Sequence, residues 1–330
     1  FRFGILTGSL NDVYQTIYGV PEEEQEEPLP GYDTTGLTDV RVTVEKVVLK
    51  NAAAIDFDAM IVASKDDVIT GMHRYFASKS ASEQNEYTGY FEGKNLIFLT
   101  LEGFSYKAVS PDLTPTLYKM MTEGFNFTNF YDSLWGGSTA TGEYSNMTGN
   151  FYTTANCLKK SADTFTYSAL GNTFLRKGYT TLAYHNGTYT YYGRNKSHPN
   201  FGYQKFTAVG NGLKLAHSTW PNSDYEMAVA TIDDFIDLKE PWHVYYMTIS
   251  GHTNYTFSGN VMARRHKSQV SGLKASEGVK AYIATELEVE KMLAYMVAEL
   301  EKAGQLENTV FVMNADHYPD RKSTRLNSSH

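Results

Sequence analysis

From residue 95 onward, short apolar runs alternate with stretches of helical periodicity. Asn95–Leu101 (NLIFLTL) is a partly β-branched apolar run with the length of a buried strand. The clearest helical pattern has apolar residues at 289, 292, 293, 296 and 300 and ends at Gly304. NTVFVMNADH (308–317) follows it and reads as another strand.

The same alternation recurs between these two strands. TPTLYKMMTEG (114–124) predicts a helix that Thr114 caps, Pro115 opens and Gly124 closes. Two more helix–strand pairs are SALGNTFLRKG with YTTLAYH (168–185), and YEMAVATIDDFIDL with HVYYMTIS (225–250). The pattern predicts an α/β fold, with a mostly parallel sheet flanked by helices on both faces.

Residues 1–92 have a different composition. They contain an acidic, proline-flanked run (PEEEQEEPLPGY, 21–32) and polar stretches such as SKSASEQNEY (78–87), which predict an extended arm or linker. The chain starts at Phe1 without a targeting segment, and no apolar stretch reaches the roughly 18 residues of a spanning helix. We therefore expect any membrane anchor to lie upstream of this chain.

Charge and cysteine content exclude some classes of function. A formal charge of -8 and a pI near 5.6 argue against a nucleic-acid binder, because no basic run could neutralise a row of phosphates. A single cysteine, Cys157, excludes an internal disulfide and a cysteine-based zinc site. It suits a bacterial cell-surface protein and a cytosolic one equally well.

Acidic and imidazole side chains follow the expected strands. They are Glu102, His185, His252 and the adjacent pair Asp316 and His317. The carboxyl ends of parallel strands meet at one edge of the sheet, so we expect these groups to converge there. Mixed oxygen and nitrogen donors suit Mn²⁺, Mg²⁺ or Zn²⁺. The neighbouring Asp and His can reach one ion because the chain is leaving the strand at that point.

The glycine-rich segment LWGGSTATGEYSN (134–146) offers candidate nucleophiles. Ser138, Thr139 and Thr141 carry hydroxyls, which need a metal or a base to become reactive near neutral pH. A helix starting here would also favour an anionic substrate through its free amides. From these residues alone, an ordinary Ser/Thr/Gly turn remains the alternative.

Several motifs, in order and spacing, resemble one family. They are NLIFLTLEGFS (95–105), TPTLYKMMTEGFNFTNFY (114–131), GSTATGE (137–143), AYHNGTYTYYGR (183–194), FGY (201–203), TISGHTNYTF (248–257) and NTVFVMNADHYPD (308–320). Together they resemble the lipoteichoic acid synthase-like branch of the alkaline phosphatase/sulfatase superfamily. The resemblance covers residues 67 to 320 and implies a catalytic domain of that fold at 93–320.

The resemblance implies specific roles for the candidate residues. Thr139 corresponds to the nucleophile, and Glu102, Thr139, Asp316 and His317 to the ligands of Mn²⁺ or Mg²⁺. The substrate-binding residues correspond to His185, Tyr192 and Arg194, and His252 to the histidine beside the leaving group. The implied reaction transfers phosphoglycerol from phosphatidylglycerol to a glycerol or glycan hydroxyl through a phospho-threonine, in cell-wall polymer synthesis on the extracytoplasmic face of a bacterial membrane.

The sequence departs from the family pattern in two places. Ala140-Thr141 stands where members have Ser-Asp, which makes Thr141 a rival nucleophile, although Glu143 keeps its spacing from Thr139. After the Asp-His motif the family domain continues, whereas residues 321–330 (RKSTRLNSSH) read as a non-native tail after a truncated domain.

Two other functions remain open at this level. A hydrolase of the phosphodiesterase or sulfatase type would use water as the acceptor, but the C/S-x-P-x-R context of sulfatases is absent from STATGE. A surface glycan-binding domain could keep the fold without catalysis.

Overall fold

The computed structural model describes residues 49–52, 55–131, 138–239 and 241–319. The chain divides into two compact units, Phe1–Glu92 and Gly93–His330. The acidic run 21–32 and the tail 321–330 lie outside the described residues.

The described part of the first unit contains two short helices, α2 (Phe57–Ala63) and α3 (Asp67–Ala77). Each begins with an aspartate whose carboxylate accepts a backbone N–H of the first turn at 2.9 Å: Asp56 from Ala59, and Asp66 from Ile69. Neither helix contains a buried residue. These helices therefore form without a hydrophobic core of their own.

The second unit is built on a six-stranded, entirely parallel sheet with the order β4-β3-β2-β5-β1-β6. Its strands are β1 (Asn95–Leu101), β2 (Thr180–Thr188), β3 (Lys205–Val209), β4 (Gly212–Leu213), β5 (Trp242–Met247) and β6 (Thr309–Ala315). The α/β prediction is confirmed. The short strands β3 and β4 were not predicted.

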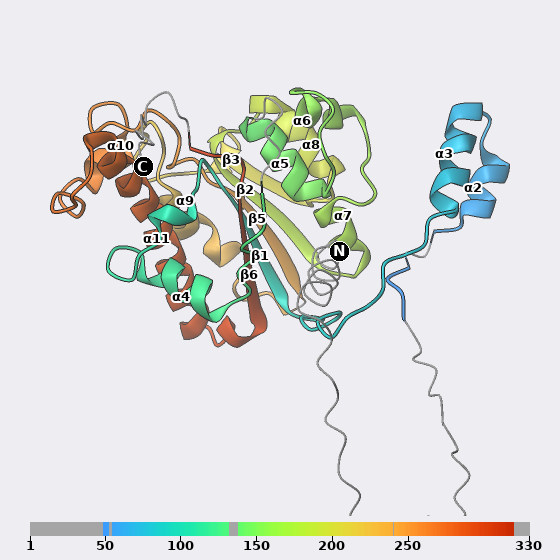
Figure 1. Cartoon of the computed structure of the whole chain (residues 1–330), viewed down its shortest axis with the longest axis horizontal. Helices are drawn as coiled ribbons and strands as arrows, with labels where there is room; N and C mark the ends of the chain where they lie inside the picture. Colours follow the sequence, from blue (N-terminus) through green and yellow to red (C-terminus); the bar gives the residue numbers. More distant parts are fainter. Residues whose placement is uncertain (1–48, 53–54, 132–137, 240, 320–330) are drawn as a thin grey trace, which may run out of the picture. The chain divides into compact units, whose positions relative to one another are not determined.

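Helices cover both faces of this sheet (Figure 1). One face carries α4 (Pro115–Glu123), α9 (Asp224–Thr231) and α11 (Glu277–Lys302); the other carries α5 (Thr139–Thr148), α6 (Cys157–Lys160), α7 (Leu170–Arg176) and α8 (Arg194–Asn200). A further short helix is α10 (Val261–Arg265). The helix predicted at 225–238 ends earlier, at Thr231, and continues as a 3₁₀ turn over Ile232–Asp234.

Two of the three buried clusters of the core cover the sheet, one on each face. In β1, Ile97, Leu99 and Leu101 face the α11 layer, whereas Phe98 faces the α5 layer, as the period of two in a strand requires. The five apolar α11 positions of the sequence pattern are all buried in the first layer. Within the described residues, no helix is both long and apolar enough to cross a bilayer.

The start of α4 differs from the prediction in its cap. The side chain of Thr114 makes no capping bond. Instead, the carboxylate of Glu290 on α11 accepts the N–H groups of Thr116 and Leu117 at 2.9 and 3.0 Å. A buried acid from a neighbouring helix therefore satisfies the free amides of α4 and joins the two helices.

Candidate active site

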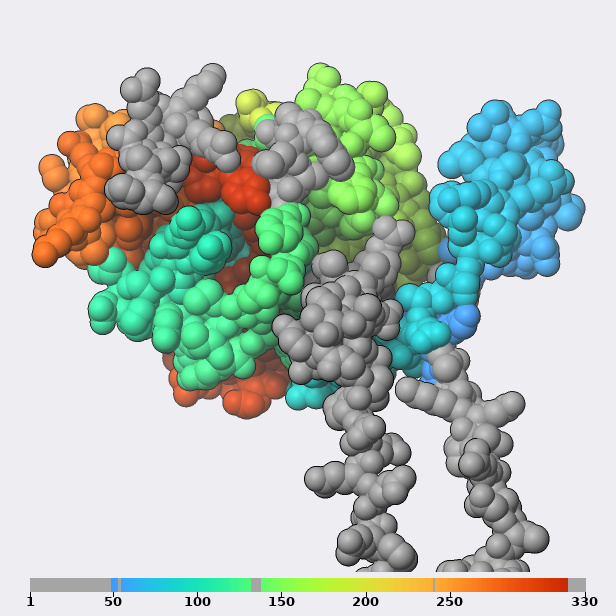
Figure 2. All heavy atoms as spheres, viewed as in Figure 1, coloured from blue at the N-terminus to red at the C-terminus, as the bar shows by residue number. Residues whose placement is uncertain are grey.

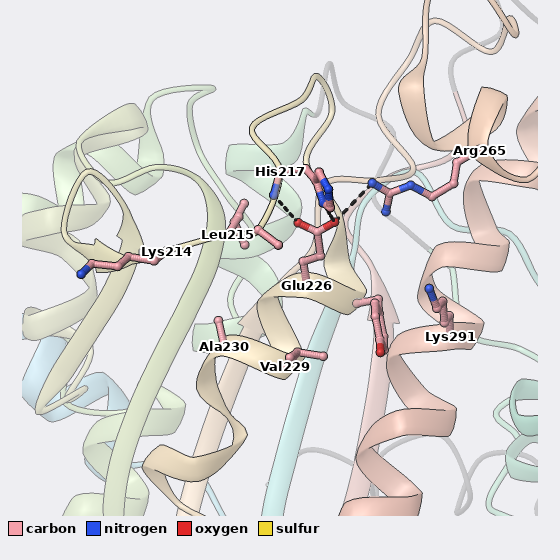
Figure 3. Close-up of a pocket in the computed structure, with 10 residues that line it drawn as sticks. Lys214, Leu215, His217, Glu226, Val229, Ala230, Arg265 and Lys291 are labelled. Atoms are coloured by element: carbon pink, nitrogen blue, oxygen red, sulfur yellow. Dashed lines mark hydrogen bonds and ion pairs between the residues drawn. The ribbon is translucent and has the colours of Figure 1, made fainter.

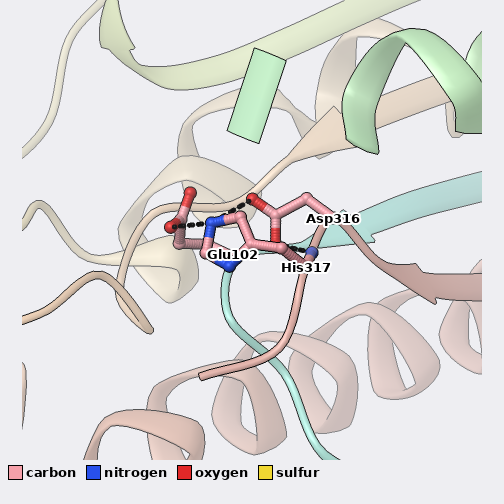
Figure 4. Close-up of side chains that lie close together, drawn as sticks. All are labelled: Glu102, Asp316 and His317. Atoms are coloured by element: carbon pink, nitrogen blue, oxygen red, sulfur yellow. Dashed lines mark hydrogen bonds and ion pairs between the residues drawn. The ribbon is translucent and has the colours of Figure 1, made fainter. Parts of the chain in front are cut away.

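The ends of β1 and β6 bring two carboxylates and an imidazole together. Glu102 directly follows β1, and Asp316 and His317 directly follow β6, its partner strand. One ligand atom from each of the three lies within 4.8 Å of the others (Figure 4). Among the described residues, no other group of three such side chains meets this condition. The predicted convergence of these three residues is present in the structure.

Local hydrogen bonds aim these groups at a common point. Oδ1 of Asp316 accepts the N–H groups of Gly103 and His317, both at 2.8 Å, while its buried Oδ2 has no hydrogen-bond partner. Nδ1 of His317 lies 2.8 Å from the carbonyl of Tyr318, so its Nε2 faces Oε1 of Glu102 at 3.3 Å and Oδ2 of Asp316 at 3.4 Å. An orphaned carboxylate oxygen and an imidazole oriented by a carbonyl fit a divalent cation.

The electrostatics of the three residues also favour a cation. Burial and the neighbouring Glu102 carboxylate raise the pKa of Asp316 well above its usual range. Burial alone would lower the pKa of His317, but Glu102 and Asp316 raise it to about 10. The pair of buried acids thus attracts positive charge, which a proton on the imidazole or a metal ion can supply.

Thr139 is the hydroxyl that reaches this group. It is the first residue of α5, and its Oγ1 lies 3.0 Å from Oε2 of Glu102 and 3.5 Å from Nε2 of His317. The rival hydroxyl of Thr141 accepts the N–H of Ser138 and donates to its carbonyl, both at 2.8 Å. Thr141 therefore closes the start of the helix, and Thr139 is left facing the candidate ligands.

Arg194 lies between Glu143 and Tyr192. The guanidinium of Arg194 is 1% exposed and binds the carboxylate of Glu143, with Nη2 2.8 Å from Oε2. The ring of Tyr192 lies 5.2 Å from Cζ of Arg194. Burial raises the pKa of the Tyr192 phenol. Burial alone would lower the pKa of Arg194, but the Glu143 carboxylate raises it above its usual value.

The sequence pattern predicted that the strand ends at His185, but the structure continues it beyond that residue. β2 continues to Thr188, with a register shift after His185 that the apolar pattern did not reveal. The ring is 3% exposed, and its Nδ1 lies 2.9 Å from the carbonyl of Met247. Burial lowers the pKa of His185 to about 3, so the ring is neutral at physiological pH.

His252 lies in the segment after β5. Burial raises the pKa of Glu102, but His317, and to a lesser extent His252, lower it overall. Its Nδ1 is 2.6 Å from the carbonyl of Thr253. Trp220, whose ring centroid lies 5.2 Å from that of His252, packs edge-on against it and is 54% exposed. Nothing in the sequence pattern had singled out Trp220.

Two buried acids near the segment between β5 and His252 were not predicted from the sequence. Asp224 accepts the N–H of Ile249 at 2.9 Å and the hydroxyl of Ser250. Glu286 is fully buried on α11, and its Oε2 has no hydrogen-bond partner within the described structure. Burial raises the pKa of Asp224 to about 6 and that of Glu286 well above its usual range. The one available signal was a run of alternating glutamates (Glu286, Glu288, Glu290) inside an apolar helix.

A separate hollow of about 810 Å³ is lined by residues from α9, α10, α11 and the segment after β4 (Figure 3). None of the predicted site residues lines it. Glu226 accepts the N–H of His217 at 2.9 Å and pairs with Arg265 at 3.3 Å. The single acid of the lining, Glu226, thus faces three cationic side chains, Lys214, Arg265 and Lys291.

The surface gives access to the end of β6. In Figure 2, red atoms of the last described residues appear beside green atoms of the preceding half of the chain. His317 is partly exposed, whereas Asp316 is buried. Of the three candidate ligands, His317 is thus the one partly exposed to solvent, since Glu102 is also buried.

Comparison with known proteins gives related enzymes and folds. Lipoteichoic acid synthase 1 of Bacillus subtilis is 26% identical over 275 residues, covering 77% of this chain and 41% of the relative. Lipoteichoic acid synthase of Staphylococcus saprophyticus is 26% identical over 272 residues, with 78% and 41% coverage. The chain spans about two fifths of the length of these curated relatives.

Solved structures share the fold. The lipoteichoic acid synthase LtaP from Listeria monocytogenes superposes with a TM-score of 0.62 at 18% identity, covering 76% of this chain and 62% of that one. The Streptococcus pyogenes phosphoglycerol transferase GacH, in complex with sn-glycerol-1-phosphate, gives 0.51 at 18% identity, with 69% and 62% coverage.

The predicted alkaline phosphatase/sulfatase-like fold is therefore confirmed, as is the resemblance to the lipoteichoic acid synthases. The model of the family described as Sulfatase matches residues 94–330, which is well over half of the chain. With the sheet, the convergent strand ends and this match in agreement, the chain belongs to the sulfatase family.

Proposed function

We propose that this protein is a metal-dependent transferase that moves a phosphoglycerol group from phosphatidylglycerol to a glycerol or glycan hydroxyl through a covalent phospho-Thr139. One observation carries the proposal. The hydroxyl of Thr139 lies 3.0 Å from Glu102 and 3.5 Å from His317, where the candidate metal ligands converge. A nucleophile among ligands of this kind is the arrangement that activates a hydroxyl near neutral pH.

Glu102, Asp316, His317 and Thr139 would hold the ion, Mn²⁺ or Mg²⁺. A bound divalent cation would lower the pKa of the hydroxyl and stabilise negative charge on the phosphoryl oxygens. The neutral imidazole and the carboxylates suit both ions, and Mn²⁺ tolerates the nitrogen ligand better.

The remaining steps belong to the side chains around Thr139. Oγ1 of Thr139, ionised by loss of its proton to solvent, attacks phosphorus, and the bond from phosphorus to the diacylglycerol oxygen breaks. His252 gives its proton to that oxygen, and Arg194 binds the phosphoryl oxygens. In the second step His252 takes the proton of the acceptor hydroxyl, whose oxygen attacks phosphorus and releases Thr139.

Tyr192 and His185 have supporting roles in this proposal. The Tyr192 ring, beside Arg194, offers an apolar face to the glycerol carbons. His185, which stays neutral, can bind the glycerol or phosphoryl group without adding charge.

The names of the relatives support the transferase, since they are lipoteichoic acid synthases and a phosphoglycerol transferase in complex with sn-glycerol-1-phosphate. The proposal extends to their setting. We place the catalytic unit on the extracytoplasmic face of a bacterial membrane, with an upstream anchor and with cell-wall polymer as the product.

The test measures metal binding and lipid turnover together. Calorimetry follows Mn²⁺ binding, and labelled phosphatidylglycerol is supplied in vesicles with and without a glycerol-phosphate acceptor. Thr139→Ala should lower diacylglycerol release at least about 100-fold, because a hydroxyl nucleophile cannot be replaced. Thr141→Ala is the matched control and should stay within about threefold, because it removes only a helix-start bond.

Each outcome decides between functions. Elongation of the acceptor supports the transferase, whereas diacylglycerol release that ignores the acceptor identifies a hydrolase. Absence of Mn²⁺ binding, or equal turnover in Thr139→Ala and the parent, would leave the glycan-binding alternative.

A further inference from the structure

A buried ion pair joins the helix of Thr139 to the segment of Arg194. Glu143 follows Thr139 by four residues on α5, so one helical turn separates them on the same side of the helix. Glu143 is 0% exposed and Arg194 1% exposed. Nε and Nη2 of the guanidinium lie 2.9 and 2.8 Å from Oε2 of Glu143, and Nε also lies 3.2 Å from Oε1.

Other buried groups hold the Glu143 carboxylate in place. The hydroxyl of Tyr245 donates to its Oε1 at 3.4 Å. Nε2 of His198 lies 3.3 Å from Oε1, in poor alignment for a hydrogen bond. Burial raises the pKa of Glu143, but Arg194 and His198 lower it to about 2, so the carboxylate is ionised at neutral pH. This carboxylate is thus a fixed negative charge.

The orientation of Arg194 follows from this pair. Glu143 occupies one edge of the guanidinium, formed by Nε and Nη2. Among the described residues no hydrogen bond engages Nη1, which leaves N–H groups for a phosphoryl oxygen. The ring of Tyr192 lies 5.2 Å from Cζ of the same guanidinium.

The ion pair of Glu143 and Arg194 also affects the net charge of the site that a substrate enters. Arg194 and Glu143 cancel each other, and two carboxylates, Glu102 and Asp316, balance one divalent cation when His317 is a neutral ligand. The site then has no surplus positive charge. A phosphoryl group with one negative charge is accommodated more readily than one with two, since like charges at short range in a buried site repel strongly.

We propose that Glu143 is a positioning residue: it orients Arg194 toward the phosphoryl group and, by neutralising it, makes the site favour phosphodiesters over phosphomonoesters. The inference rests on the proposed function for the identity of the phosphoryl site. It assigns a role to a residue that the metal-ligand geometry leaves unused.

Two substitutions distinguish the effect of Glu143 on the position of Arg194 from the effect of its negative charge. Glu143→Asp keeps the charge but shortens the side chain by one methylene, so it should raise KM for a diester about tenfold and leave the preference between esters unchanged. Glu143→Gln keeps the length but removes the charge. It should raise the ratio of p-nitrophenyl phosphate to bis-p-nitrophenyl phosphate hydrolysis about tenfold or more.

Glu288→Gln is the matched control. Glu288 is also a fully buried carboxylate, and it pairs with one arginine and one histidine, Arg265 at 3.0 Å and His266. It lies outside the proposed site. Glu288→Gln should lower stability to a comparable extent without changing the ester ratio.

A binding measurement makes the test independent of turnover. Calorimetry with inorganic phosphate at pH 8, where it is mostly dianionic, should show about tenfold tighter binding to Glu143→Gln than to the parent, each with Mn²⁺. Equal phosphate affinity and an ester ratio that moves no more than in Glu288→Gln would overturn the inference. A shift in phosphate affinity without lipid turnover in any variant would instead count against the proposed function alone.

Discussion

Gly142 is the position where one added methyl group should disturb the candidate site most directly. It is the fourth residue of α5, and the helix backbone there lies against the chain just after β6. An ideal Cβ on Gly142 would lie 1.8 Å from the carbonyl oxygen of Asp316, 2.4 Å from its carbonyl carbon and 2.6 Å from its Cα. All three are backbone atoms, so no side-chain rotation can relieve the contact.

The expected cost of Gly142→Ala comes from two opposing effects. In a helix interior, alanine is favoured over glycine by about 1 kcal/mol. Real Cβ atoms essentially never approach another heavy atom closer than 3.0 Å, so α5 and Asp316 must separate by more than 1 Å. Overpacking of that kind costs roughly 1–3 kcal/mol, occasionally more. Because no side chain can move aside, we take the upper end of that range, which leaves a net destabilisation of about 2 kcal/mol, or roughly 4–8 °C in Tm for a unit of this size.

We expect Gly142→Ala to change Mn²⁺ affinity more than it changes the free energy of unfolding. Thr139 is carried by α5 and Asp316 by the end of β6, so their separation spreads the candidate ligands. Ligand constellations tolerate displacements of only about 0.5 Å. We therefore expect Mn²⁺ affinity to fall at least about tenfold, comparable to the loss of an orienting group.

The assay combines thermal denaturation, with and without Mn²⁺, and calorimetric titration of the ion. Gly272→Ala is the control, because the ideal Cβ of Gly272 in the same unit meets no atom within 4 Å and its backbone is not left-handed. It should leave Mn²⁺ affinity unchanged and Tm within about 2 °C. A Gly142→Ala protein that melts at or above the parent temperature, with unchanged Mn²⁺ affinity, would refute the close packing of α5 against Asp316.

Three further predictions follow from single contacts. Glu102→Gln should lower Mn²⁺ affinity about 100-fold or more in calorimetry, because it removes a charged ligand; unchanged affinity would exclude this residue from the site. Glu290→Ala should lower the unfolding free energy by about 1–2 kcal/mol in urea, since it frees the amides of Thr116 and Leu117; no loss would mean that water replaces the cap without cost. Burial lowers the pKa of His243 to about 3, so the folded ring stays neutral while the unfolded one takes a proton as pH falls below about 6.5. The parent should then lose about 1.4 kcal/mol through this ring between pH 7.5 and 5.5, and His243→Gln should lose that much less over the same range.

Much of the fold could be predicted because strands and helices of ordinary length leave periodic patterns. β1, β5 and β6 are apolar enough to read directly, and the helix after residue 277 keeps its spacing over many turns. β3 and β4 escaped prediction for a physical reason. Lys205–Val209 is short and includes polar residues, and Gly212–Leu213 is too short to show any period.

The candidate site was partly predictable from strand ends. Glu102, Asp316 and His317 converge because the strands that precede them are parallel neighbours. Chemistry alone could not separate Thr139 from Thr141, since both are hydroxyls of one motif. The two hydrogen bonds of Thr141 to Ser138 do separate them, and they depend on where the helix begins.

Interactions between distant segments left no local pattern. Glu143 and Arg194 are 51 residues apart, and neither stands in a periodic context that would pair them. The structure pairs Arg194 with Glu143, which lies one helical turn after Thr139 on α5.

The first five residues of α5 connect the separate parts of the site. Thr139 reaches the candidate metal ligands, Gly142 lies against the backbone of Asp316, and Glu143 holds Arg194. A movement of this one helix would therefore displace the proposed nucleophile, the candidate metal ligands and the arginine proposed to bind phosphate together. Because these contacts are buried and made partly by backbone atoms, they define the relative positions more rigidly than flexible surface side chains could. Packing also explains why residue 142 is a glycine, since only glycine lets the helix approach Asp316 so closely.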